Sequence, residues 1–183
     1  ISDLTGLEHC INLTELILFA NPISEISTLA NLTNLTILVM GGNQISDISA
    51  LANLTNLDYL GLGHNQISDI SSLANLTNLT TLYLDGNQIN DISPLANLTN
   101  LTELVLNGNP LTDTAGPIIQ TLQDGGTNVQ HDPIVDPVAI NIPDDNLRAK
   151  LEEALGKEVG DPMTDLELAG LSGELDTSAS SIS

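Results

Sequence analysis

The chain has 183 residues, 24 of them acidic and three basic, which gives a formal net charge of −21. The basic residues are confined to the last quarter, and residues 1–128 contain no Lys or Arg. Such a surface cannot displace the counterions of nucleic acid or of an anionic membrane, so neither is expected as a partner. The length suits one domain, or one domain with an appendage.

No stretch is long and apolar enough to span a bilayer. The first ten residues, ISDLTGLEHC, lack the basic start and apolar run of a signal peptide, as expected of a mature fragment. Cys10 is the single cysteine, so no intrachain disulfide can form. Its place in the repeat register, described next, predicts a buried and inert thiol.

An asparagine returns every 22 residues, each time within the pattern LxxLxLxxNxI. The five copies are centred on Asn21, Asn43, Asn65, Asn87 and Asn109. A fixed period of this length is typical of a leucine-rich-repeat solenoid, in which equivalent residues stack in columns. The asparagine amide suits the bend of each turn, because it can satisfy buried backbone donors and acceptors there.

Within one unit, the alternation at residues 82–84 (LYL) predicts a short strand. Stacked copies of this strand form a parallel sheet with about 4.8 Å between neighbours. The stretch that follows mixes periods and turn-forming residues, which predicts short 3₁₀ or irregular arcs on the convex side. The sequence therefore predicts an α/β solenoid with its parallel sheet on the concave face.

The run NQISDIS followed by LANLTNLTTLYLDGN resembles the 22-residue repeat of bacterial internalin-type leucine-rich-repeat proteins, and the match covers residues 1 to about 115. The resemblance implies a curved solenoid, an extracellular or bacterial cell-surface location, and protein recognition through the concave face. Catalysis is not implied by it.

We expect three parts: a solenoid of about five repeats over 1–115, a terminal turn and Pro-containing linker over 116–142, and a small helical cap with a half-repeat strand over 143–183. The linker is expected because Thr114, Gly116 and Pro117 replace core positions of the repeat.

The predicted cap resembles the segment that precedes the first repeat in related bacterial proteins, yet here it comes last. Residues 175–183 fit the repeat register and continue into residues 1–2, so the order looks permuted. The cap either closes its own solenoid, as in a circular permutant, or docks on the next molecule head to tail. We favour the second. The residues expected in this cap-to-edge contact are Leu147, Leu151, Leu155, Leu175, Ile182, Leu4 and Leu7.

Residues that alternate with the core leucines point to the concave surface. The three Phe and Tyr residues of the chain all fall there, which favours a binding patch over chance exposure. The alternative is that aromatic and β-branched residues simply suit strands. The predicted ligand-binding set is Glu15, Ile17, Phe19, Ile37, Val39, Tyr59, His64, Tyr83, Asp85, Glu103 and Val105.

An acidic column consists of Asp3, Glu25, Asp47, Asp69, Asp91 and Asp113. We expect each carboxylate to cap the short turn that follows it. The alternative, a row of oxygen ligands for divalent cations, is weaker. No metal site and no cofactor are predicted.

The chain offers no phosphate-binding glycine loop and no nucleophile–base pair, so we do not expect an enzyme. The leading hypothesis is a recognition module that binds a protein through the concave face. The rival is a structural or self-assembling scaffold, natural or engineered, joined head to tail by its cap. A weaker third hypothesis is binding of a repetitive ligand, such as a glycan or ice, on a threonine ladder formed by Thr33, Thr55, Thr77 and Thr99.

Overall fold

The computed structural model describes residues 1–134, 147, 149–151 and 153. The chain divides into two compact units, Ile1–Ile134 and Val135–Ser183, and each is described by itself.

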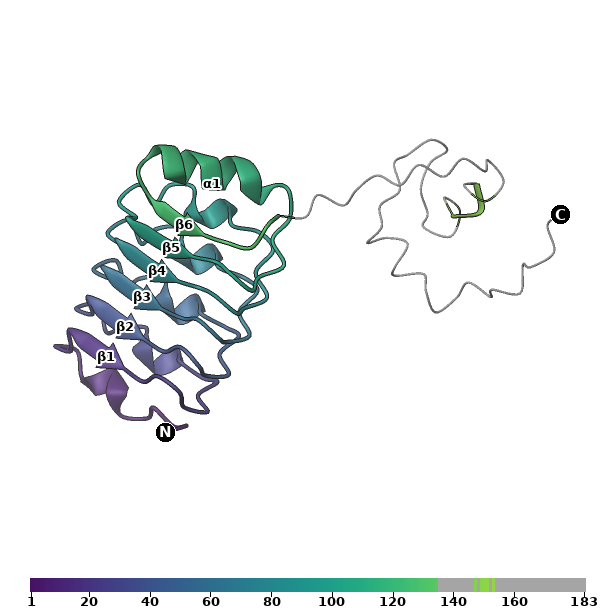
Figure 1. Cartoon of the computed structure of the whole chain (residues 1–183). Coiled ribbons are helices and arrows are strands. Elements are labelled where there is room, and N and C mark those ends of the chain that lie inside the picture. Colours follow the sequence, from purple (N-terminus) through teal and green to yellow (C-terminus); the bar gives the residue numbers. More distant parts are fainter. Residues whose placement is uncertain (135–146, 148, 152, 154–183) are drawn as a thin grey trace. The chain divides into compact units, whose positions relative to one another are not determined.

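The first unit is built around a six-stranded parallel sheet whose strands follow chain order (Figure 1). The strands are β1 (Glu15–Ile17), β2 (Ile37–Val39), β3 (Tyr59–Gly61), β4 (Thr81–Tyr83), β5 (Glu103–Val105) and β6 (Asn128–Gln130). From β1 to β5 each residue pairs with the residue 22 positions later, for example Leu38 with Leu60 and Leu60 with Leu82. The predicted sheet and its register are therefore confirmed.

Short 3₁₀ turns return the chain on the convex side, as predicted. They are η1 (Leu7–His9), η2 (Ser27–Leu29), η3 (Ser49–Leu51), η4 (Ser71–Leu73) and η5 (Ser93–Leu95). Consecutive turns of this series contact one another, so they stack in the same order as the strands.

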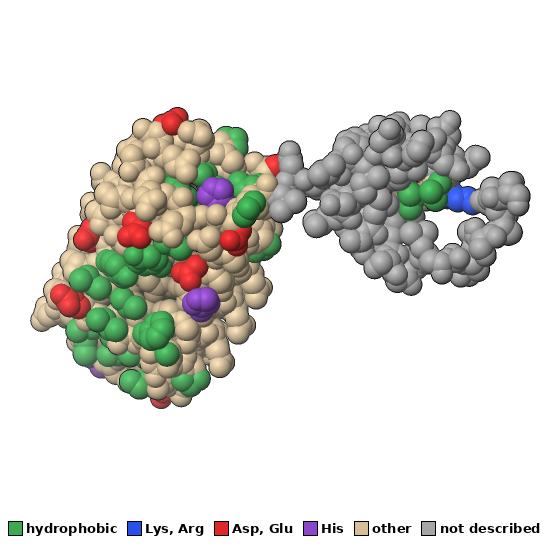
Figure 2. Space-filling view, in the orientation of Figure 1, with side chains coloured by type: hydrophobic (Ala, Val, Ile, Leu, Met, Phe, Trp, Pro, Cys, Tyr) green, Lys and Arg blue, Asp and Glu red, His purple; other side chains and the backbone are tan. Residues whose placement is uncertain are grey.

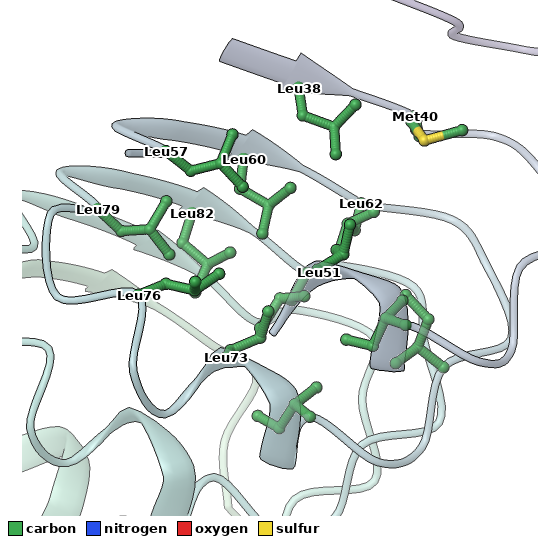
Figure 3. Close-up of a cluster of buried hydrophobic side chains, with 14 of the residues drawn as sticks. Leu38, Met40, Leu51, Leu57, Leu60, Leu62, Leu73, Leu76, Leu79 and Leu82 are labelled. Carbon is green, nitrogen blue, oxygen red and sulfur yellow. The ribbon is translucent and has the colours of Figure 1, made fainter. Parts of the chain in front are cut away.

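The core is a stack of leucine and isoleucine layers between the sheet and the 3₁₀ turns (Figure 3). Leu60, Leu82 and Leu104, one on each of three adjacent strands, have no exposed surface. Burial of such a side chain contributes roughly 1.5–3 kcal/mol. Leu16, the equivalent residue of the edge strand β1, is only partly buried. Full burial therefore requires a turn on both sides of a layer.

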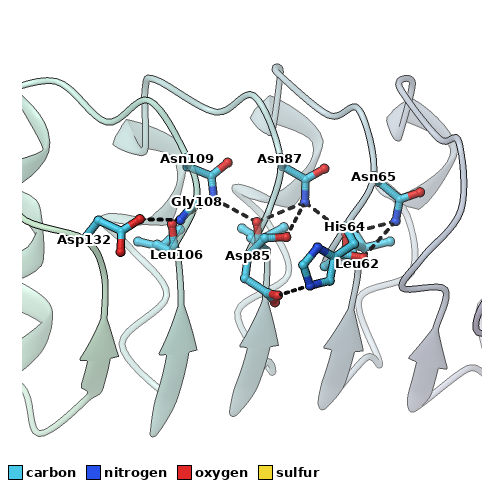
Figure 4. Close-up of polar contacts among 11 residues, drawn as sticks. Leu62, His64, Asn65, Asp85, Asn87, Leu106, Gly108, Asn109 and Asp132 are labelled. Atoms are coloured by element: carbon cyan, nitrogen blue, oxygen red, sulfur yellow. Dashed lines mark hydrogen bonds and ion pairs between the residues drawn. The ribbon is translucent and has the colours of Figure 1, made fainter.

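The repeating asparagines form a ladder beside the core, and its three internal members, Asn43, Asn65 and Asn87, are buried (Figure 4). The Nδ2 of Asn65 donates to the carbonyl oxygens of Leu62 and Met40, each at 3.0 Å. Its Oδ1 accepts from the Ile45 N–H at 3.0 Å. Asn43 and Asn87 make the same set of bonds in their turns. Each asparagine thus joins its own turn to the preceding one, and the predicted structural role is confirmed.

The solenoid continues beyond the end predicted from the sequence. In place of a linker, helix α1 (Ala115–Asp124) follows the last repeat and leads into β6, which pairs with β5. Gly116 and Pro117 lie in the first turn of α1, where the missing proline N–H would have no intrahelical partner. The α1 side chains of Ile119 and Leu122 are buried in the core, so the helix covers the last layer of leucines.

Asp132, just after β6, ends the backbone ladder. In an internal turn the Gly86 N–H donates to the backbone oxygen of Asn107. At the last turn the Gly108 N–H donates instead to Oδ2 of Asp132 at 2.6 Å, and the Asn107 side chain donates to Oδ1 at 3.1 Å. A side-chain carboxylate therefore takes the place of the next turn's carbonyl (Figure 4).

At the other end, the edge strand β1 borders a hollow of about 300 Å³ lined by Leu4, Leu7, Leu16 and other residues of the first turn. Cys10 is exposed, so the prediction of a buried thiol is wrong. The reason is that its equivalents in later turns are buried by a preceding turn, and no described residue packs there before the first one.

The cap-to-edge contact stays a prediction. Of its residues, Leu147 and Leu151 lie in described helical positions of the second unit, where Leu151 is buried and Leu147 is exposed. Leu155, Leu175 and Ile182 lie outside the described residues.

The acidic column caps turns as predicted at four of its positions. The Ser49 N–H donates to Asp47 and the Ser71 N–H donates to Asp69, each at 2.8 Å, and Asp3 and Asp91 bind Thr5 and Ser93 in the same way. These hydrogen bonds lower the pKa of Asp47 and Asp69, because they stabilise the ionised carboxylate.

The lowered pKa values predict a loss of stability in acid. A carboxyl group whose pKa is depressed in the folded state stabilises the fold above its ordinary value of 3.8 and loses this contribution as the pH falls. We expect the double variant Asp47→Asn, Asp69→Asn to show a shallower decline of unfolding free energy below about pH 5, since the amide oxygen still accepts but does not titrate. Urea titrations followed by circular dichroism at stepped pH measure this. Identical slopes for the two proteins would contradict it.

Candidate functional site

The concave side of the sheet carries a hollow of about 180 Å³. Its walls are side chains from four successive turns, and its floor is largely glycine backbone. The lining residues are Phe19, Val39, Gly41, Tyr59, Gly61, Gly63, His64, Tyr83 and Asp85. All three Phe and Tyr residues of the chain thus meet in one place.

The hollow exists because glycines interrupt two columns of side chains. Gly61 pairs with Val39 on one side and Tyr83 on the other, and a Cβ there would lie 3.6 Å from a Val39 methyl carbon and 3.5 Å from the Tyr59 ring. These are ordinary van der Waals distances, so a methyl group at Gly61 would fit and would occupy part of the hollow. In the next column the Phe19 ring packs over Gly41.

Tyr59 and Tyr83 form a tilted pair, with ring centroids 5.6 Å apart and an interplanar angle of 50°. Hydrogen bonding to the Glu103 carboxylate, then burial, raises the pKa of Tyr83. Burial, then the charge of Glu103, raises the pKa of Tyr59. Both phenols therefore remain neutral at physiological pH.

His64 stands at one rim of the hollow, in a left-handed backbone conformation with φ of 55°. The equivalent positions in three other turns are glycines, and a side chain in this conformation costs about 1–2 kcal/mol. Ala20 has the same φ, so the strained backbone is a property of this position in the turn and is not caused by histidine. What His64 adds is a contact of its Nε2 with Oδ2 of Asp85 at 3.1 Å (Figure 4).

Negative charge surrounds the hollow. Residues 1–134 carry acidic side chains but no Lys or Arg, and Glu15, Asp85 and Glu103 belong to the concave turns. Figure 2 shows hydrophobic side chains gathered over the first strands of the sheet, with acidic side chains and histidine beside them. A face of this kind attracts positively charged partners.

The predicted site residues are partly brought together. Phe19, Val39, Tyr59, His64, Tyr83 and Asp85 line the hollow, and Glu103 adjoins both tyrosines. Glu15, Ile17, Ile37 and Val105 lie on the same face without lining it. The sequence reasoning missed the glycine floor of Gly41, Gly61 and Gly63. The available signal was the interruption of side-chain columns by glycine.

Within the described part of the chain, no three His, Cys, Asp or Glu side chains gather in a way that could hold a metal ion. The helices of that same part are all too short or too polar to cross a bilayer.

Comparison with known proteins agrees with the fold. The family described as Leucine Rich repeats (2 copies) matches residues 11–53, 33–75, 55–97 and 77–119 in overlapping pairs. A search of curated proteins found no match.

Two solved structures from Listeria monocytogenes are similar. Internalin C2 shares 39% identity over 72% of this chain with a TM-score of 0.68, and the internalin InlF shares 40% over 74% with a TM-score of 0.67. The chain spans only 57% and 39% of these two proteins. A leucine-rich-repeat protein from Leptospira interrogans, 22% identical over 68% of this chain and 38% of its own, shares the fold with a TM-score of 0.54. The chain therefore belongs to the leucine-rich-repeat family, with repeats similar to those of the Listeria internalins.

Proposed function

We propose that the chain is a non-catalytic recognition module that binds a protein partner through the concave hollow, outside the cell or on a bacterial surface. The observation that carries this proposal is the exposure of large apolar side chains beside the tyrosine pair. Ile17 and Phe19 are 65% and 62% exposed, whereas Val39, the residue next to Ile17 in register, is partly buried. Aromatic residues such as Phe19 supply much of the binding energy at protein interfaces, so their presence on this face supports a protein as the ligand.

The test compares three proteins on an array of purified extracellular protein domains. The first is the unaltered chain, and the second carries Phe19→Ser, Tyr59→Ser and Tyr83→Ser. The control carries Asn31→Ser, Asn53→Ser and Asn75→Ser, at exposed positions on the convex side. Loss of three central anchors is expected to weaken binding at least about 100-fold, equivalent to some 2–4 kcal/mol. Array domains that bind the first and second proteins equally would refute the proposal.

A head-to-tail scaffold is the second candidate, and the hollow at the β1 edge favours it. That hollow is lined by the apolar side chains of Ile1, Leu4, Leu7, Leu16 and Leu18, a surface suited to covering by another segment. Light scattering over a concentration series gives the mass in solution. A particle that stays at 19.2 kDa at every concentration excludes this candidate.

A further inference from the structure

The concave hollow is too small to hold a drug-sized molecule, but it is large enough to hold one amino-acid side chain. Its volume of about 180 Å³ lies below the range of roughly 300–1,000 Å³ typical of small-molecule sites. A protein partner would therefore place one residue in it, and the chemistry of the lining decides which residue fits.

The two tyrosine rings favour a cation. A positive group within about 6 Å of a ring centroid is attracted by the negative face of the ring. Because the centroids of Tyr59 and Tyr83 are 5.6 Å apart, one cation can approach both rings. The phenols are neutral at physiological pH, and Glu103 adds a full negative charge at the hydroxyl end of Tyr83.

A carboxylate is also present in the wall itself. Asp85 holds its Oδ2 against His64, whereas its Oδ1 lies over Gly63 on the floor of the hollow. The Asp85 side chain is only 28% exposed, so an ion pair formed there would be less screened than one at the open surface. No Lys or Arg of residues 1–134 competes for it.

The remaining walls are apolar and suit the stem of a long basic side chain. The Phe19 ring, which packs over Gly41, and a Val39 methyl group beside Gly61 both line the hollow. Arg and Lys bury their methylene stems along such surfaces while the charged head reaches a polar partner. An acidic residue would be repelled by Asp85 and Glu103, and an apolar residue would leave the Asp85 carboxylate with the His64 contact alone.

We propose that the hollow receives an Arg or Lys side chain presented by the partner protein, with the stem between Phe19 and Val39 and the charged head between the tyrosine rings and Asp85. This proposal rests on the proposed function, since it names the chemistry that the same site recognises.

The probes are three blocked tripeptides: acetyl-Gly-Arg-Gly-amide, its Lys equivalent, and its citrulline equivalent, which keeps the shape of arginine without the charge. The full chain has two Tyr, one Phe and no Trp, so ring signals in a ¹³C–¹H NMR spectrum report on the site with only histidine beside them. We expect the Arg and Lys peptides to shift the Phe19, Tyr59 and Tyr83 signals, and the citrulline peptide to bind at least about fivefold more weakly.

Two variants separate shape from charge. Gly61→Ala fills the floor and meets its neighbours at ordinary distances of 3.5 and 3.6 Å, so the fold should be kept while Arg binding falls at least about fivefold. Asp85→Asn should weaken Arg binding at least about threefold and leave citrulline binding unchanged. The control, Asp113→Asn, removes the same charge from the convex acidic column and should change neither.

Equal shifts from the Arg and citrulline peptides would overturn the proposal, as would the absence of any shift up to roughly 10 mM peptide. The array experiment distinguishes this failure from failure of the proposed function. If the triple serine variant loses array binding but the peptides do not bind, the recognition surface stands and the basic side chain is rejected. If the Arg peptide binds but the serine variant keeps its array binding, the hollow holds a cation and the partner binds elsewhere.

Discussion

Replacement of Asn65 by Ala lowers the expected free energy of unfolding by about 2–4 kcal/mol, because a buried N–H left without a partner costs roughly 1–3 kcal/mol and each further hydrogen bond lost about 1 kcal/mol. The Ile45 N–H loses its acceptor. The carbonyl oxygens of Met40 and Leu62 each lose one donor and keep the amide of the neighbouring asparagine in the ladder. Water cannot replace the amide, since Asn65 is 8% exposed in the middle of the stack. Urea denaturation followed by circular dichroism measures the loss.

The matched control is Asn21→Ala at the first position of the same ladder. The Asn21 amide donates to the carbonyl oxygens of Leu18 and Phe19, and the bond to Phe19 is exposed. Water can take over there, so we expect a loss of about 1 kcal/mol or less. Equal losses at the two positions would show that the ladder does not act through buried backbone groups.

Replacement of Leu60 by Ala has the second large expected effect, a loss of about 2–5 kcal/mol. Leu60 is fully buried, and its neighbours in register are Leu38 on β2 and Leu82 on β4 (Figure 3). Both neighbours belong to rigidly hydrogen-bonded strands, so the layer can close the cavity only in part. The same urea titration measures the effect.

Leu16→Ala removes the same atoms from the edge strand β1, where only Leu38 flanks the residue in register. Leu16 is partly buried, and its loss should cost about 1 kcal/mol, since less surface returns to water. A cost at Leu16 that matches the cost at Leu60 would contradict the view that each layer depends on turns on both sides.

The repeated part of the fold could be predicted from the sequence because a period of 22 leaves no freedom of register. Once Asn43 and Asn65 occupy equivalent positions, Leu38 must pair with Leu60 and Tyr59 must share a face with Ile37. The concave aromatic patch followed from the same constraint. Its position needed no knowledge of side-chain contacts.

The end of the solenoid was harder to predict for two different reasons. Ala115, Ile119 and Leu122 have helical spacing in the sequence, but Gly116 and Pro117 favoured the prediction of a linker. Strand β6 offers a single apolar residue, Val129, and is a strand only because β5 provides its hydrogen-bonding partners. A three-residue strand of this kind has no local signal.

The hollow could not be predicted from the sequence, because it depends on the side-chain conformations of neighbouring residues. Gly61 lacks a side chain, but only the positions of the Tyr59 ring and Val39 show that there is room for a methyl group there. At Gly63 the equivalent space is filled, because the Asp85 carboxylate leans into it. The space beside the two glycines therefore differs, because the side chains around them adopt different conformations.

Because Asp132 and helix α1 close the last turn from outside the repeats, the number of repeats is a property separate from the structure of the ends. The internal asparagines bind only groups in their own and the preceding turn, so a whole unit of 22 residues could be duplicated or lost while the contacts of Asp132 with Gly108 and Asn107 persist. An insertion of 21 or 23 residues would instead leave one turn a residue short or long, so that part of that turn would miss its column. The solenoid can thus change length in whole steps, and each step would alter the distance from the tyrosine pair to its C-terminal end.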